Sequence, residues 1–520
     1  MSDRRRYMLA ALCGLVAAIV ALGLAEAVAL VVAPSSSPLF AVGSFVIDIV
    51  PPWVKETAIA LFGTGDKVAL LVSLGILITL LALAIGILEY RRPPLGTVGL
   101  AVIAVIALTA AVTRANAAVL APVPTVIGML GGALVLRTAV KRLRLWDVAT
   151  ANRGSERGSE QRYIYSRRSF VTFVAANAGA ALVVGILART VNAATTAVNQ
   201  ARAALKLPKP AVAAPPIPGG ADLGIEGAYP LVTPNSVFYR IDTALQVPSV
   251  DVATWKLRIV GEVENEIEVT FDELIALPLI ETYATLACVS NEIGGGLIGN
   301  AKWLGYPIRD LLARAKPKSG ADMVLSRSVD GFTAGTPLSI LQEEDRNAIL
   351  AVGMNGDPLP LEHGFPVRMV VPGLFGYVSA TKWVTELKVS RFSKETAYWT
   401  ARGWSPEGPV KIGSRIDVPK YTAAIPVGTT TVAGVAWSQH TGISAVEIRV
   451  DKGEWMPAKL ANAISTDTWV QWSSSFEAST GVHIVEVRAT DANGTVQSGE
   501  HKDVVPDGAE GWHAITVDAG

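Results

Sequence analysis

The chain has 520 residues, half of which are apolar, and it carries 45 basic and 45 acidic side chains. This length supports two or three domains, and the apolar content is too high for a wholly soluble protein, so part of the chain is expected in a lipid bilayer. A net charge of zero provides no global field for nucleic acid, which we do not expect as a partner. Two cysteines cannot build a disulfide framework, and we expect no structural disulfide.

Residues 1–190 are predicted to form a transmembrane domain of five α-helices. Its apolar runs have the length needed to cross hydrocarbon about 30 Å thick at about 1.5 Å per residue. They cover residues 7–32, 68–88, 97–112, 117–136 and 170–187. Buried core helices of a soluble protein are the alternative, but five such runs in succession without charged faces disfavour it.

Basic residues in the short loops predict how these helices are oriented. Arginines precede the first run and follow the second, and a cluster of lysines and arginines lies between the fourth and fifth runs, whereas the other loops are poorer in positive charge. The positive-inside rule then places the N-terminus in the cytoplasm. Five spans of the cytoplasmic membrane put everything after residue 187 outside, in the periplasm or its equivalent.

The residues before the fifth run, Ser-Arg-Arg-Ser-Phe-Val at 166–171, resemble a twin-arginine export signal. Two adjacent arginines before a membrane helix are also common as plain topology determinants, so both interpretations stay open. The export interpretation implies that the following domain crosses the membrane already folded.

Residues 191–228 are predicted to be a Pro/Ala-rich linker that extends away from the membrane. Residues 229–398 mix strands and short helices. A strand is expected at 255–263, a short helix after a threonine cap at 271–277, and a buried strand at 366–372. The pattern predicts an α+β domain.

Residues 399–520 change to a purely β pattern. The runs 445–450 and 483–490 alternate apolar with polar residues, and turn signals such as Asn493-Gly494 separate the runs. No helical period is present, so we expect a small β-sandwich.

Cys288 is the only cysteine outside the hydrophobic N-terminal region, and a glycine-rich turn at residues 294–296 follows it. A lone thiol of this kind is either a small buried hydrophobe or a reactive or metal-binding sulfur. Its surroundings resemble the molybdenum-ligand segment of the sulfite oxidase family of molybdopterin oxidoreductases. The residues that carry this resemblance are Cys288, Asn291, Trp303, Gly305, Pro307, Asp310, Leu311 and Leu312.

A second block, residues 359–384, resembles the cofactor-binding strand and loop of that family, and the C-terminal domain resembles its immunoglobulin-like, dimerisation-type domain. The resemblance covers roughly residue 231 to the C-terminus and indicates a membrane-anchored bacterial form of actinobacterial type. It implies oxygen-atom transfer on a small-molecule substrate, and it allows a homodimer.

The resemblance also implies a set of site residues. Cys288 would supply the one protein thiolate to molybdenum, as soft sulfur suits this metal, with Asn291 and Glu292 beside it in the catalytic segment. The positions implied to bind molybdopterin are Asn235, Tyr239, Arg240, Asp242, Ser328, His363, Arg368, Ser379, Ala380, Thr381 and Lys382. Arg368 on an apolar strand would be costly to bury without an anion, whereas His363 alone could equally be a satisfied core histidine.

One position departs from the family's pattern. Sulfite oxidases follow the asparagine with an arginine that helps to form an anion pocket, whereas this chain has Glu292. A carboxylate there would repel sulfite by roughly 1 kcal/mol at a surface-like dielectric constant. A neutral or cationic substrate, such as an S- or N-oxide, is therefore at least as well supported as sulfite.

Electron transfer is expected to need a separate partner protein. The sequence has no Cys-x-x-Cys-His haem attachment motif and too few cysteines for an Fe–S cluster. All five histidines lie outside the predicted spans, so paired histidine ligation of a haem within the bilayer is excluded. We expect molybdopterin as cofactor, with no haem and no Fe–S cluster, and a membrane region that serves as an anchor.

Two other functions stay open at this point. Cys288, His363 and an acid such as Asp310 could form a metal-independent cysteine-nucleophile hydrolase, although the arginine-rich pocket would then have no role. A non-catalytic, membrane-tethered binding protein is the second alternative, and the retained Cys288 argues against it. Only the oxidoreductase would contain about one molybdenum and one pterin per chain.

Overall fold

A computed structural model describes residues 2–32, 37–51, 54, 57, 61–62, 66–113, 120–151, 167–190 and 193–520. The chain divides into two compact units. One contains Met1–Ala197 with Thr243–Gln246, and the other contains Val198–Asp242 with Val247–Gly520. We describe each unit by itself.

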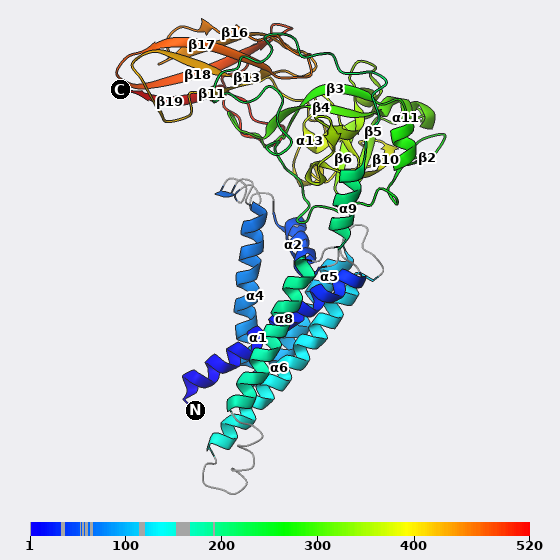
Figure 1. Ribbon diagram of the computed structural model, residues 1–520, viewed down its shortest axis with the longest axis vertical. Helices are drawn as coiled ribbons and strands as arrows, with labels where there is room; N and C mark the ends of the chain where they lie inside the picture. The colour runs from blue at the N-terminus through cyan, green and yellow to red at the C-terminus, as the bar shows by residue number, and fades with distance from the viewer. Residues whose placement is uncertain are drawn as a thin grey trace. The chain divides into compact units, whose positions relative to one another are not determined.

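The first unit is a bundle of apolar helices (Figure 1). Its helices are α1 (Asp3–Val32), α2 (Pro38–Ile49), α4 (Asp66–Arg91), α5 (Leu95–Val112), α6 (Pro122–Ala151) and α8 (Arg167–Thr190). Helix α1 packs against α4, α6 and α8. A Cβ atom on Gly14 would lie 1.9 Å from the carbonyl oxygen of Ala82, and one on Gly86 would lie 2.1 Å from that of Ala10. The backbones of α1 and α4 therefore touch, as small residues permit between membrane helices.

Among the described residues, four helices are long and apolar enough to cross a membrane: Asp3–Leu30, Lys67–Arg91, Leu95–Val112 and Pro122–Val148. They correspond to the first four predicted runs. The fourth helix reaches well beyond the predicted end at residue 136, and residues 114–119 before it lie outside the described part of the chain. The fifth predicted run lies within α8, which is helical but is not among these four. Most of the basic loop used to orient the helices, including Ser166 of the arginine motif, also lies outside the described residues.

The second unit begins with an α+β domain that contains one mixed sheet and one antiparallel sheet (Figure 1). One has the order β2-β1-β10-β5-β6, and the other has the order β3-β4-β7-β8 with β9 paired to β7. The strands are β1 (Lys256–Gly261), β2 (Ile267–Thr270), β3 (Ile280–Ala287), β4 (Ile298–Pro307), β5 (Met323–Ser328), β6 (Thr333–Pro337), β7 (Ile349–Met354), β8 (Asp357–Pro358), β9 (Arg368–Val370) and β10 (Val384–Ser390). Short helices join them: α10 (Phe271–Ala276), α11 (Ile308–Ala315), α12 (Leu338–Gln342), η2 (Leu361–His363) and α13 (Gly376–Ser379).

The local predictions in this domain agree with these elements. Thr270 caps α10 and exchanges hydrogen bonds with Glu273, which forms a capping box. The strand in the continuous apolar run at 366–372 is shorter than expected. Only Arg368–Val370 pairs with β7. The α+β prediction is confirmed.

Residues 413–519 form two largely antiparallel sheets around one apolar core (Figure 1). The sheets have the orders β11-β13-β17-β16 and β12-β19-β18-β14-β15. The strands are β11 (Gly413–Val418), β12 (Ala423–Ile425), β13 (Gly428–Trp437), β14 (Ile443–Val450), β15 (Met456–Pro457), β16 (Lys459–Leu460), β17 (Val470–Ala478), β18 (Gly481–Asp491) and β19 (His513–Ala519), and a 3₁₀ turn, η3 (Thr400–Arg402), precedes them. Trp472 is fully buried at the centre of this core.

The segment predicted as an extended linker is structured. Ala193–Ala204 forms helix α9, and Arg202 donates to the carbonyl oxygens of Pro358 and Leu359 at 2.8 and 2.7 Å. Further on, the Ala211 amide donates to Leu279, and the Leu223 amide donates to the Gln471 side chain. Prolines lack an amide hydrogen and cannot donate such bonds. The residues between them still bond to the rest of the second unit, so this segment runs along the surface of that unit.

We predict that Trp472→Ala destabilises the sandwich by about 3–5 kcal/mol, because it removes a fully buried indole from a packed core. Tyr421→Ala is the control, since this ring is 67% exposed and its loss should change stability by less than about 0.5 kcal/mol. Denaturant unfolding of the full chain in detergent measures both. Equal effects of the two substitutions would contradict the assigned core.

Candidate active site

Cys288 follows strand β3 and starts a tight loop. Its amide donates to the Leu297 carbonyl at 2.9 Å, and the Asn291 side chain accepts from the Leu297 amide at 2.7 Å. Asn291 therefore closes the loop that presents the thiol. Only 8% of Cys288 is exposed, and burial raises the pKa of its thiol, although hydrogen bonds from Ser290 and Val289 oppose this. A thiolate at this position needs a positive partner such as a metal.

A group of buried cations lies in the same domain. Lys382 contacts the Asp242 carboxylate at 2.5 Å and donates to the Glu362 carbonyl, and Arg240 contacts Asp242 at 2.9 Å. Arg368 is 5% exposed, and its guanidinium lies 5.1 Å from the Trp303 ring. It donates to the backbone carbonyls of His363, at 3.3 Å, and Met369, at 3.4 Å.

Two of these cations, Lys382 and Arg240, share the Asp242 carboxylate, and Arg368 lies within electrostatic range of Lys382. Desolvation lowers the pKa of Lys382 to about 8 and that of Arg368 to about 10. Burial, with help from these two cations, lowers the pKa of His363 to about 3, so this ring is neutral, and its Nε2 lies 3.2 Å from the Asn235 carbonyl. The excess positive charge is costly unless an anion occupies the pocket.

Tyr239 connects the thiol to the cationic pocket. Burial raises the pKa of its hydroxyl, the neighbouring Cys288 adds to this shift, and Arg368 opposes it. These opposite effects place Tyr239 within electrostatic range of both groups. Of the predicted site residues, the structure therefore brings together Cys288, Tyr239, Arg240, Asp242, His363, Arg368 and Lys382.

Other predicted residues bond within the protein. Ser379 donates to the carbonyls of Leu374 and Phe375 just before α13. Thr381 pairs with Ser326 at 2.7 Å, and Ser328 accepts from the Asp330 amide. The Asn235 side chain bonds to Asn355, and the amide of Ala380 caps α13. Glu292 is exposed, so solvent screens its charge and weakens the expected repulsion of sulfite.

The sandwich holds the loop after Cys288, which the sequence did not indicate. Arg415 of β11 donates to the Gly295 carbonyl at 2.8 Å and pairs with Asp417, also at 2.8 Å. A Cβ atom on Gly294 would lie 2.2 Å from the His513 ring of β19. Burial, followed by the effect of Arg415, lowers the pKa of His513 to about 4, so this ring packs in its neutral form.

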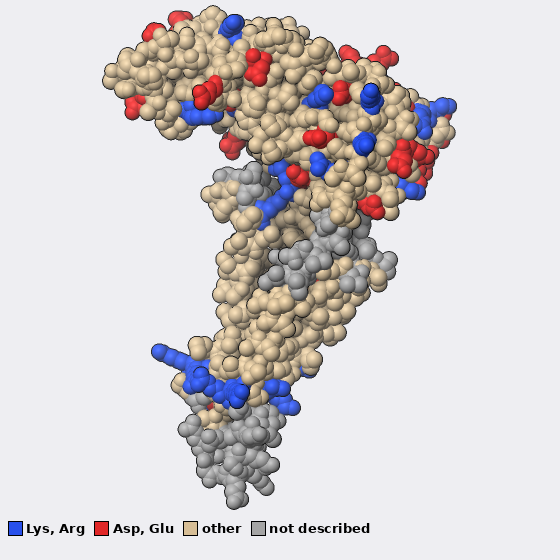
Figure 2. Space-filling view, viewed as in Figure 1, with Lys and Arg blue, Asp and Glu red and all other residues tan. Residues whose placement is uncertain are grey.

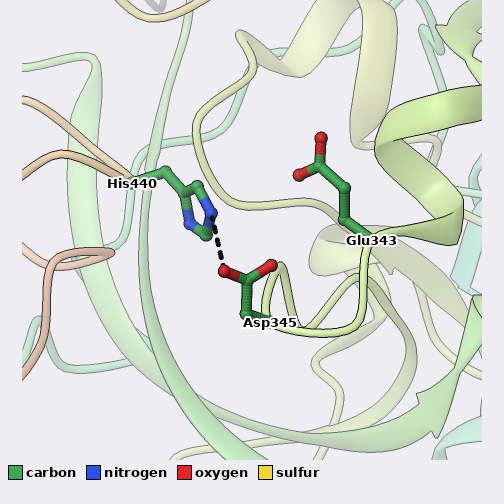
Figure 3. A group of neighbouring side chains, drawn as sticks. All are labelled: Glu343, Asp345 and His440. Atoms are coloured by element: carbon green, nitrogen blue, oxygen red, sulfur yellow. Dashed lines mark ion pairs between the residues drawn. The ribbon is translucent and has the colours of Figure 1, made fainter.

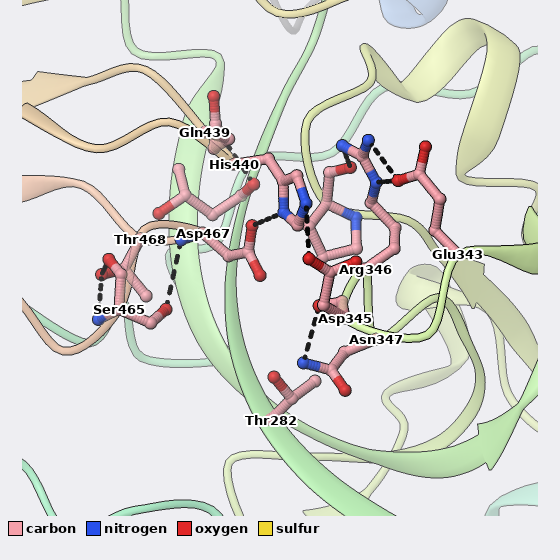
Figure 4. A network of polar contacts seen from close by, with 12 residues as sticks. Thr282, Glu343, Asp345, Arg346, Asn347, Gln439, His440, Ser465, Asp467 and Thr468 are labelled. Atoms are coloured by element: carbon pink, nitrogen blue, oxygen red, sulfur yellow. Dashed lines mark hydrogen bonds and ion pairs between the residues drawn. The ribbon is translucent and has the colours of Figure 1, made fainter. Parts of the chain in front are cut away.

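A second cluster joins the catalytic domain to the sandwich. Glu343, Asp345 and His440 offer ligand atoms within 4.8 Å of one another, and the His440 ring points toward Asp345 (Figure 3). Figure 4 shows that Arg346 already pairs with Glu343, at 2.6 Å, and that Asp467 contacts His440 at 3.0 Å. The cluster can hold a cation by its donor set, but its ion pairs serve as a contact between the domains.

The structure does not assemble the hydrolase alternative. His363 contacts the Asn235 carbonyl, and Asp310 on α11 lies 3.6 Å from Arg309. Within residues 193–520, no hydrogen bond joins Cys288, His363 and Asp310. A nucleophile, its base and an orienting acid would require such contacts.

Comparisons with known proteins identify the domain that carries these residues. A model described as the oxidoreductase molybdopterin binding domain matches residues 244–399. The chain is 31% identical to mitochondrial sulfite oxidase of Mus musculus over 272 residues, 44% of this chain and 49% of that protein. It is 30% identical to sulfite oxidase of Gallus gallus over 317 residues, 51% of this chain and 68% of that protein. The crystal structure of the sulfane dehydrogenase SoxCD from Paracoccus pantotrophus has 23% identity and a TM-score of 0.47, and the match covers 53% of this chain and 75% of that chain.

The matched domain and the site define a molybdopterin-dependent oxidoreductase. The chain belongs to the sulfite oxidase-like family of these enzymes, which confirms the resemblance seen in the sequence. It spans about half the length of the mammalian relatives that it matches.

The residues present fit the cofactor of this family. Cys288 provides a soft sulfur donor for molybdenum. The pocket has a net charge of two positive units, because it contains three cations, Arg368, Lys382 and Arg240, and the Asp242 carboxylate. This surplus suits a phosphate group. The donor set therefore matches a metal held by one thiolate and an anionic organic group beside it.

We predict that Gly294→Ala distorts the loop that carries Cys288. The added methyl group would collide with His513, and the φ angle of +75° is strained for alanine, with a cost of about 1–3 kcal/mol. Gly296→Ala is the matched control because nothing lies within 4 Å of its added Cβ. Thermal unfolding and molybdenum content measure both variants, and equal values for the two would contradict the contact with His513.

We predict that molybdopterin retention weakens as the pH rises above about 8. The pKa of Lys382 is about 8 in the protein alone, and a bound anion raises it. Above about pH 8, Lys382 therefore keeps its proton in the complex but loses it in the free site. The affinity for molybdopterin is full below this pH and falls by at most about tenfold per pH unit above it.

The Lys382→Gln variant should bind molybdopterin more weakly than the wild type. Its retention of molybdopterin should not change as the pH rises above about 8. Lys388→Gln, whose lysine pairs with Glu395 at a more exposed position, should keep the wild-type profile. Pterin fluorescence after dialysis of the full-length protein measures retention. A wild-type profile that is flat would contradict the assigned role of Lys382.

Proposed function

We propose that this protein is a membrane-anchored molybdenum-cofactor oxidoreductase that catalyses oxygen-atom transfer on a small substrate outside the cytoplasmic membrane. Cys288 is the protein ligand to molybdenum. The observation that supports this most is the buried thiol next to a pocket with surplus buried positive charge. Membership of the sulfite oxidase-like family supports the same chemistry.

The chain's own residues have distinct roles in this proposal. Arg368 and Lys382 hold the anionic end of molybdopterin, and Asp242 orients Lys382 through their 2.5 Å contact. Asn291 fixes the loop so that the Cys288 thiolate faces the metal. Neutral His363 donates to the Asn235 carbonyl and supports the pocket without adding charge. Bound molybdopterin supplies the redox chemistry, while the protein orients it.

The substrate is proposed to be a neutral S- or N-oxide rather than sulfite. The position after Asn291 carries Glu292 in place of the arginine that helps sulfite oxidases to bind an anion. Glu292 is exposed, so the absence of the arginine weighs more than repulsion by the carboxylate. Both substrate classes remain consistent with the family.

The membrane topology belongs to the same proposal. Residues 170–187 of α8 contain no charged side chain, so α8 would be a fifth span after the four apolar helices. With the N-terminus inside, five spans place residues 198–520 outside, and the arginine pair before the fifth span would serve export or topology. The immunoglobulin-like sandwich would mediate a homodimer, and the electrons for oxide reduction would come from a separate protein, with no haem or Fe–S cluster in this chain.

Metal analysis of the full-length protein tests the proposal. We expect about one molybdenum per chain in the wild type and a loss of at least about tenfold in Cys288→Ser, because a serine hydroxyl is a poor replacement for a soft thiolate ligand. Cys13→Ser, which changes the other cysteine within α1, should keep the metal.

Molybdenum retained at full occupancy in Cys288→Ser would refute ligation by this residue. Activity that survives complete loss of metal would favour a hydrolase. A steady-state comparison with the loaded wild type then decides the substrate, since fast sulfite oxidation without oxide reduction would overturn the proposed oxide.

A further inference from the structure

The helical unit contains a basic cavity that the proposed oxidoreductase does not use. This cavity is a hollow that is open to the surface, with a volume of about 480 Å³, and it lies between α6 and α8. Two arginines, Arg142 and Arg168, line it together with Phe173 and the polar side chains of Ser169, Thr172 and Asn177. Arg168 belongs to the arginine pair that the sequence marked before the fifth apolar run.

The packing of α8 on α6 creates this cavity. Trp146 and Phe170 stack with their ring centroids 5.8 Å apart, and Phe170 is buried in the core of the bundle. Residues 169, 172, 173 and 176 follow helical spacing, so they lie on one face of α8. The aromatic stack therefore fixes the position along the axis of α6 at which this face of α8 lies beside Arg142.

The lining leaves guanidinium groups as the main donors for a ligand. The Thr172 hydroxyl donates to the Arg168 carbonyl at 2.6 Å, and the Asn177 amide donates to the Phe173 carbonyl at 2.8 Å. The Arg142 guanidinium lies 4.3 Å from the centroid of the Phe173 ring, a contact that orients it. Such a cavity suits a ligand with anionic oxygens on one side and apolar carbon on the other.

The cavity lies where an anionic headgroup would be found. Lysines and arginines gather at one end of the helical unit, as Figure 2 shows in blue. Arg142 and Arg168 both lie next to apolar helical segments, so their guanidinium groups are level with the boundary of the hydrocarbon. Basic pockets between membrane helices on the cytoplasmic side bind lipid phosphates.

We infer that this cavity binds the phosphate headgroup of an anionic phospholipid, with Arg142 and Arg168 as its ligands and Phe173 against the glycerol backbone. The inference rests on the proposed membrane anchoring. It gives the arginine pair of α8 a role in the folded protein, independent of export. The bound lipid would join α6 to α8 and so hold the proposed fifth span against the bundle.

Lipid binding by the detergent-solubilised full-length protein tests this inference. Phosphatidylglycerol is titrated in mixed micelles and bound lipid is counted by native mass spectrometry, with phosphatidylcholine as the neutral lipid. Arg142→Gln and Arg168→Gln should each lower the affinity for phosphatidylglycerol about fivefold, and the double variant about 25-fold. Lys141→Gln removes the same charge from the adjacent, exposed position of α6 and should change the affinity less than about twofold.

Three results would overturn the lipid assignment: equal binding of phosphatidylcholine, unchanged affinity in the double variant, or full displacement of phosphatidylglycerol by inorganic phosphate. The last would assign the cavity to free phosphate. Alkaline carbonate extraction of membranes separates this inference from the anchoring on which it rests. Release of the wild type into solution refutes the anchoring, whereas retention without lipid binding refutes only the lipid site.

Discussion

The catalytic domain depends on an imbalance of buried charge. Arg368 and Lys382 are almost completely buried, and Arg240 is half-buried. In the described contacts, the Asp242 carboxylate pairs with Lys382 and Arg240, whereas Arg368 bonds to backbone carbonyls. Burying uncompensated charge costs several kcal/mol or more. The same burial lowers the pKa values of Lys382 and Arg368, and an anionic ligand in this pocket would offset the cost of burying them.

The thiol depends on support from a distant part of the chain. Arg415 bonds to the carbonyl of Gly295, and His513 fills the space beside Gly294, so the sandwich fixes the loop after Cys288. A ligand loop held from two sides loses less conformational entropy when it binds a metal. The sandwich consequently belongs to the active-site architecture, whether or not it also forms a dimer.

The helical unit uses a different kind of packing. Gly14 and Gly86 bring two helix backbones into contact, whereas α6 and α8 meet through Trp146 and Phe170 and leave a basic cavity beside them. Small residues permit close van der Waals contact without a hydrophobic driving force, which is the situation within lipid. The rings of Trp146 and Phe170 separate α6 from α8, so a polar ligand can enter the cavity between these two helices.

The sequence alone determined the features that depend on local pattern: the apolar runs, the α+β and sandwich domains, the Thr270 cap and the segment around Cys288 that identifies the family. These follow from residue periodicity and short-range spacing. Only the tertiary structure decided that Asn291 closes the loop, that Glu292 is exposed, that α9 replaces part of the linker, and that Arg415 contacts Gly295. Arg415 lies 120 positions from Gly295, and such contacts depend on how whole domains pack, which no local pattern encodes.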